Sequence, residues 1–154
     1  MQKKNSAITL PYLIDGDKVV TESDAVCVYL VHKAGKVELL GRNADEQVAL
    51  ATVAGVIRDF HKEYIKLVYG AYGDYDFEVA KKEYIEKFKP YLAKLSGIIG
   101  EKEYYCGEIT WYDFAVADFM QTLWLFEAPL IESYPNIWNH QKRVWDLPAL
   151  KSYH

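Results

Sequence analysis

The chain lacks several features that mark specialised classes of protein. It has only two cysteines among 154 residues, Cys27 and Cys106, and they are not in CxxC spacing. This excludes a disulfide-held scaffold and a thioredoxin-type redox centre, and it is typical of a reducing compartment. No apolar run approaches the roughly 20 residues that span a bilayer. The apolar stretch near the N-terminus is broken by Pro11, unlike a signal peptide. We therefore expect a soluble cytoplasmic protein.

An excess of charge of one sign is also missing. Lys and Arg number 18 and Asp and Glu 22, for a net charge of -4, so we expect neither nucleic acid nor a membrane as a partner. The sequence has no internal repeat and no low-complexity segment. Hydrophobic residues make up 51% of it, which is too apolar for disorder. A chain of this length buries about 68–70% of its unfolded surface, enough for one domain or two small packed lobes.

The first 35 residues predict a β-hairpin followed by a helix. Residues 10–14 form a short apolar run, Asp15-Gly16 is a turn dipeptide, and residues 18–20 read as the return strand. A helix is expected to begin around residues 21–24 and to end near Gly35.

The rest of the chain predicts a bundle of about five helices, so the fold class is α+β. Residues 44–69 carry apolar side chains at intervals of three and four. After a loop with Gly70, Gly73 and Asp74, a helix from about Glu78 is expected to kink or restart at Pro90. Two more helices are expected at 111–126 and 135–145, with a short final turn from Pro148.

The helix at 111–126 has the clearest start signal. Thr110 suits an N-cap, and Asp113 at the third helical position takes the Glu/Gln role of a capping box. Ile109 and Phe114 fit the accompanying hydrophobic staple. The following residues are apolar nearly all round, which is typical of a buried helix. We interpret Thr110 and Asp113 as structural caps rather than ligand-binding residues.

Four segments, in order and in register, resemble the glutathione S-transferase family over essentially the whole chain. Residues 10–16 (Leu-Pro-Tyr-Leu-Ile-Asp-Gly) resemble the strand that follows a cis-proline, and they lean toward the mu class. Residues 22–25 (Glu-Ser-Asp-Ala) resemble the glutathione-binding turn, and residues 110–113 the capping box of the core helix. The family's penultimate helices are matched by residues 134–137 together with Arg143, Pro148 and Tyr153.

The resemblance implies both a fold and an activity. Residues 1–36 would be the C-terminal part of a thioredoxin-like glutathione-binding domain, and residues 43–154 an all-helical C-terminal domain. The family adds the thiol of glutathione to electrophiles. Glutathione would thus be a co-substrate, with no cofactor and no metal, and a homodimer is the default assembly.

The resemblance also assigns residues to glutathione binding. With Pro11 in cis, the N–H and C=O of Leu10 would pair with the cysteinyl unit as an added strand. Ser23, at a helix start, would bind the γ-glutamyl carboxylate. Glu22 would accept from the γ-glutamyl amino group, and Asp59 matches the acidic residue that reaches this group across the dimer interface.

Simpler interpretations remain open for these positions. Ser23 suits a plain N-cap, and Glu22 and Asp59 suit charges that face water. Tyr69 matches a tyrosine of the mu-class electrophile pocket, but with 13 tyrosines in the chain packing or loop anchoring is the favoured role. His61 is expected on a helix surface.

The pattern departs from the family at its beginning. The family places its thiol-activating Tyr, Ser or Cys in a βαβ unit that should precede residue 1, so we assign no catalytic residue. Ala7 stands where mu-class members have an aromatic that locks the dimer. Without that unit, the strand at 10–14 has an open edge, and an isolated hairpin is marginal. Either a longer protein or another chain, such as a second copy, is expected to cover this edge.

Two functions from different classes follow. The first is a glutathione transferase, of which this chain would lack the catalytic strand. The second is a non-catalytic structural or interaction subunit with the same fold. The retained Leu10-Pro11 and Glu22-Ser23 segments favour the first, whereas the missing catalytic segment and Ala7 favour the second.

Overall fold

The computed structural model describes residues 10–70 and 76–152. Ala7, Gly73, Asp74 and Tyr153, which the sequence motifs include, lie outside the described residues. Within the described part, no helix is both long and apolar enough to cross a membrane.

The predicted hairpin and helix are present at the start of the described chain. β1 (Tyr12–Asp15) pairs antiparallel with β2 (Lys18–Thr21), with Tyr12 opposite Thr21. Gly16 has a φ of 58° and so provides the left-handed turn that few other residues adopt. α1 (Ser23–Lys33) packs against both strands. Among the described residues, β1 has no strand partner other than β2.

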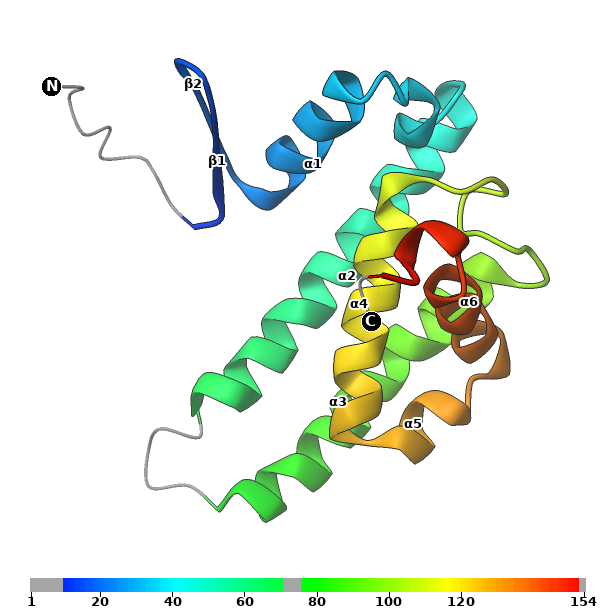
Figure 1. The fold of residues 1–154 in the computed structure, drawn as a ribbon. Helices are drawn as coiled ribbons and strands as arrows, with labels where there is room; N and C mark the ends of the chain where they lie inside the picture. The colour runs from blue at the N-terminus through cyan, green and yellow to red at the C-terminus, as the bar shows by residue number, and fades with distance from the viewer. Residues whose placement is uncertain (1–9, 71–75, 153–154) are drawn as a thin grey trace, which may run out of the picture.

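A short link leads from this unit to the helical bundle. In Figure 1 the hairpin and α1 lie to one side of the bundle, and α2 and α3 run side by side. α4 packs against α2, α5 and α6. The remaining elements are η1 (Val37–Leu40), α2 (Ala44–Gly70), α3 (Phe77–Ile99), α4 (Trp111–Phe126), α5 (Ala128–Glu132), α6 (Pro135–Trp145) and η2 (Pro148–Leu150).

The core sits between the helices and is rich in aromatic rings. Phe60 of α2 is fully buried, and its ring centroid lies 5.1 Å from that of Phe88 and 5.1 Å from that of Phe119. Tyr91 stacks on the same ring at 5.0 Å. One buried side chain therefore joins α2 to both α3 and α4, and such aromatic pairs add about 0.5–1.5 kcal/mol each beyond area burial.

A second aromatic contact joins α4 to α6. The indoles of Trp124 and Trp138 stack at 5.6 Å with an interplanar angle of 11°. Trp124 Nε1 donates to Glu132 at 3.0 Å, and Lys142 Nζ lies 5.3 Å from the centre of the Trp138 ring. The stack is half-buried, so it fixes the outer side of the α4–α6 contact.

Two details of the helices differ from expectation. The restart at Pro90 does not occur, because α3 is a continuous helix in which Phe88 and Leu92, on either side of the proline, are both fully buried in the same core. Packing thus compensates for the hydrogen bond that proline removes. α5 was not predicted, since its five residues are too few for a periodic pattern; its Leu130 and Ile131 are buried.

Thr110 and Asp113 form a capping box at the start of α4. Asp113 Oδ2 accepts hydrogen bonds from Thr110 N–H at 2.7 Å and from the Thr110 hydroxyl at 2.8 Å. Oδ1 accepts from Tyr105 N–H at 3.1 Å and lies 2.9 Å from His140 Nε2. The cap is therefore also the point at which a loop and α6 attach to α4.

Candidate functional site

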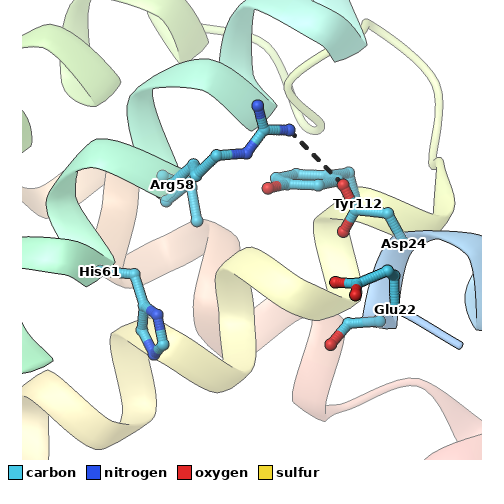
Figure 2. A pocket seen from close by; sticks show the side chains of 7 residues that line it. Glu22, Asp24, Arg58, His61 and Tyr112 are labelled. Atoms are coloured by element: carbon cyan, nitrogen blue, oxygen red, sulfur yellow. Dashed lines mark ion pairs between the residues drawn. The ribbon is translucent and has the colours of Figure 1, made fainter. Parts of the chain in front are cut away.

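A cleft of about 570 Å³ lies where α1 begins and faces α2 and α4 (Figure 2). Three lining residues come from the start of α1, three from α2 and one from α4. They are Glu22, Ser23, Asp24, Ile57, Arg58, His61 and Tyr112. The cleft thus lies between the hairpin–α1 unit and the helical bundle.

Glu22 has an unusual backbone. Its φ of 72° and ψ of 131° make it the one non-glycine residue with positive φ in the described chain. Such conformations cost about 1–3 kcal/mol and cluster at functional sites. Glu22 occupies the N-cap position of α1, and its carbonyl accepts from Val26 N–H at 2.9 Å. The conformation places Glu22 beside Ser23 in the cleft.

Ser23 and Asp24 are the first two residues of α1. The first N–H groups of a helix have no partner within it, and together with the helix dipole they favour an anion. This wall of the cleft therefore offers an anion-binding helix end next to the Glu22 carboxylate. The helix end and the Glu22 carboxylate together suit the α-amino acid end of a ligand, which carries a negative carboxylate and a positive ammonium group.

The opposite wall comes from α2. Arg58 projects toward Asp24 (Figure 2), and their charged groups are 3.6 Å apart. His61 lies one turn further on, with its ring 5.2 Å from that of Phe119. His61 is exposed, as expected for a helix surface, and it also lines the cleft. This wall is basic at Arg58, opposite the acidic start of α1.

Tyr112 closes the cleft from α4. It is 7% exposed, and its hydroxyl donates to the Ala54 carbonyl at 3.4 Å. Burial raises the pKa of this phenol to about 12, with a smaller contribution from the negative charge of Asp24. A phenol that ionises so reluctantly is a poor acid–base group at neutral pH.

The structure places the predicted binding residues in different surroundings. Glu22 and Ser23 lie together in the cleft. The Leu10–Pro11 peptide bond is cis, and Leu10 is 85% exposed, but neither residue lines the cleft. Only the Glu22-Ser23 part of the predicted set thus comes together here.

The two predicted residues of α2 lie outside the cleft. Asp59 points to the surface, 3.4 Å from Lys62 of the same helix. Tyr69 is 64% exposed in the last turn of α2. The structure therefore does not bring either residue to Glu22 and Ser23.

Five lining residues were not predicted as binding residues from the sequence: Asp24, Ile57, Arg58, His61 and Tyr112. Ile57 was assigned only to the apolar stripe of its helix, and Tyr112 only to the capped segment. The spacing of Ile57, Arg58 and His61 does place them on neighbouring parts of one helix surface. Nothing in the local sequence indicates that this surface faces the start of α1.

The cysteines and acidic side chains offer no further chemistry. Both thiols are half-buried, and burial raises the pKa of Cys27 and of Cys106. Neither is therefore an activated nucleophile. In the parts of the chain that the structure describes, no three His, Cys, Asp or Glu side chains are grouped so as to hold a metal ion.

Family descriptions match almost the whole chain. The description "Glutathione S-transferase, C-terminal domain" matches residues 58–154, and "Glutathione S-transferase, N-terminal domain" matches residues 1–38. Human glutathione S-transferase Mu 5 is 30% identical over 145 residues, and rat Mu 1 is 28% identical over 145 residues. Each match covers 94% of this chain and 63% of the relative, so the chain spans less than two thirds of these relatives' length.

Solved structures give the same result. The Pi-class glutathione S-transferase of Onchocerca volvulus superposes with a TM-score of 0.79 at 27% identity, over 94% of this chain and 68% of its own. The glutathione S-transferase of Ascaris lumbricoides has a TM-score of 0.80 at 21% identity, over 94% and 72% of the two chains. The second likeness shows the fold alone.

Proposed function

Because the chain belongs to the glutathione S-transferase family, we propose that its cleft binds the γ-glutamyl end of glutathione. The main observation that supports this proposal is the Glu22-Ser23 pair in the cleft at the start of α1, with Glu22 at a φ of 72°. The N–H groups of the helix start and the Ser23 hydroxyl receive the carboxylate. The Glu22 carboxylate receives the amino group.

In this proposal the chain has two parts. Residues 1–36 form part of a thioredoxin-like glutathione-binding domain, and residues 43–154 form the helical domain. The family's fold supports this division, and α1 ends at Lys33 while α2 begins at Ala44. Leu10 and Pro11, which do not line the cleft, are assigned to the cysteinyl unit. We also propose a cytoplasmic location, where glutathione is abundant and thiols stay reduced.

Retention on immobilised glutathione tests this binding. The wild-type chain is expected to be retained and to elute with free glutathione. Ser23→Ala should weaken retention, since it removes one hydrogen bond to a charged group, worth about 1.5–3 kcal/mol. Ser133→Ala is the matched control, because the Ser133 hydroxyl donates to Leu130 O at the end of α5. Equal retention of both variants would contradict the role of Ser23.

The reaction we propose is conjugation. The glutathione sulfur forms a bond to an electrophilic carbon, a leaving group such as chloride departs with the bonding electrons, and the thiol proton passes to solvent. No cofactor takes part. Asp59 and Tyr69 are candidates for contacts that a second copy of the chain or an electrophile would complete.

A second candidate, a non-catalytic structural or interaction subunit with the glutathione-transferase fold, is favoured by one observation. The phenol in the cleft, Tyr112, has its pKa raised to about 12 and donates to a backbone carbonyl. It is therefore unsuited to stabilising a thiolate. Turnover of a chloronitrobenzene-type electrophile by the chain decides between the two. A rate above the uncatalysed reaction supports the transferase, and its absence despite glutathione binding supports the subunit.

We further propose that another chain, such as a second copy, covers the open edge of β1. β1 pairs with β2 alone among the described strands, and Leu10 and Ile14 are 85% and 63% exposed. An apolar, unpaired strand edge is a template for further pairing. Light scattering after size exclusion measures the mass. A monomer at micromolar concentration with no bound partner would contradict the proposal.

A further inference from the structure

The charges of the cleft are divided between its two walls. Glu22 and Asp24 place negative charge at the start of α1, whereas α2 contributes Arg58, the one Lys or Arg among the lining residues. Apart from the backbone N–H groups at the start of α1, Arg58 is therefore the group in the cleft that attracts a negative charge. The γ-glutamyl end, placed at Glu22 and Ser23, lies on the opposite side.

Arg58 can exchange its partner Asp24 for a carboxylate of a ligand. Its side chain is 61% exposed and that of Asp24 is 54% exposed, with 3.6 Å between their charged groups. Exposed ion pairs contribute only about 0–1 kcal/mol. A ligand carboxylate that forms a two-point contact with the guanidinium would replace Asp24 at little cost.

The remaining lining offers little apolar surface. Ile57 and Tyr112 are each 7% exposed, so they have little surface left to bury against an apolar ligand. His61 presents a polar ring on the same wall as Arg58. A purely apolar second substrate would gain little here, whereas a polar and negatively charged one would be recognised.

From these observations we infer that Arg58 is a specificity-determining residue that selects a second substrate bearing a carboxylate. The substrate class is an electrophile that carries a carboxylate on a short chain away from the reacting carbon. The inference rests on the proposed binding of glutathione at Glu22 and Ser23, which line the same cleft as Arg58.

Two glutathione conjugates of matched length test the inference by calorimetry at low salt. S-hexylglutathione ends in a methyl group, and S-(5-carboxypentyl)glutathione ends in a carboxylate. Wild-type chain is expected to bind the carboxylated conjugate about three- to ten-fold more tightly, as estimated for a partly exposed charge-assisted pair. Arg58→Gln should abolish this preference without weakening S-hexylglutathione.

Two further variants sharpen the test. Arg42→Gln is the matched control, because Arg42 pairs with Glu108 at 3.0 Å and does not line the cleft; the preference should persist in it. Asp24→Asn removes the competing carboxylate and should increase the preference.

The measurements distinguish a failure of the inference about Arg58 from a failure of the proposed glutathione binding. Equal binding of the two conjugates by the wild type overturns the inference and leaves the proposed function standing. Equal weakening of both conjugates by Arg58→Gln also overturns it, since Arg58 would then serve glutathione itself. If neither conjugate nor free glutathione binds, the proposed function fails and the inference fails with it.

Discussion

At the residue scale, Asp113 shows how much one buried carboxylate can hold together. It is 1% exposed and accepts hydrogen bonds from Tyr105 N–H, Thr110 N–H and the Thr110 hydroxyl. Its Oδ1 also lies 2.9 Å from His140 Nε2. Asp113→Ala leaves these buried groups without their partner, so we expect the free energy of unfolding to fall by about 3–5 kcal/mol. Urea denaturation followed by circular dichroism measures the change.

Asp76→Ala is the control for this variant. Asp76 caps α3 by accepting from Glu78 N–H at 3.0 Å and Val79 N–H at 3.2 Å, on the exposed surface. A cap of this kind contributes about 1 kcal/mol. Affinity for glutathione should be nearly unchanged in both variants, since neither residue lines the cleft. Equal destabilisation by the two substitutions would show that burial and the His140 contact add nothing.

Unlike Asp113→Ala, a substitution of Glu22 is not expected to lower the stability of the fold. Its φ of 72° is strained for glutamate and readily adopted by glycine. Glu22→Gly is therefore expected to leave the melting temperature unchanged or to raise it, while weakening glutathione binding several-fold. Thermal unfolding and calorimetry measure the two effects. A lower melting temperature with unchanged affinity would assign Glu22 to structure instead.

At the element scale, Asp15 connects the hairpin turn to α1. Hydrogen bonds from Lys33 and from Tyr29 lower the pKa of Asp15 below its usual value. Because the folded pKa is depressed, the ionised Asp15 contributes stability at pH values above the unfolded pKa of about 3.9. This contribution is lost as the pH falls through the folded pKa.

Asp15→Asn should therefore destabilise the chain at pH 7 and lose its effect at low pH. The difference in unfolding free energy between wild type and variant, measured from pH 7 to pH 3, should shrink toward the acidic end. Asp17→Asn, beside the same turn, is the control. A difference that is constant with pH would exclude an ionic role for Asp15.

The helices and strands also show which parts of the fold can be predicted from local sequence. The Asp15-Gly16 turn and the Thr110–Asp113 cap are short-range signals, and both elements lie where these signals predict them. Of the two outcomes expected at Pro90, the restart does not occur, because Phe88 and Leu92 on either side of it are buried in the same core and α3 is continuous. In the cleft, Asp24, Arg58 and Tyr112 are far apart in sequence, so their proximity depends on how α1, α2 and α4 pack.

At the scale of the whole molecule, the two parts differ in burial. Val31 is the one buried side chain in β1, β2 and α1, whereas α4 has seven buried residues. Opening of the hairpin–α1 unit should cost less free energy than opening of the bundle. Amide hydrogen exchange should therefore be much faster in residues 12–33 than in residues 111–126.

Glutathione provides the check on this prediction. Binding at Glu22 and Ser23 stabilises the state in which α1 is folded, so saturating glutathione should slow exchange in residues 12–33 selectively. Exchange in α4 should change little. Uniform exchange over both parts, with or without glutathione, would show that they unfold as a single unit.

The Trp124–Trp138 stack has a spectroscopic consequence. Two nearly parallel indoles with centres 5.6 Å apart couple their electronic transitions, which should give a paired positive and negative band in the circular dichroism of the aromatic region. Substituting either tryptophan with phenylalanine would remove the pair of bands. The docking of α6 on α4 thus carries an intrinsic optical reporter, readable during folding without any added label.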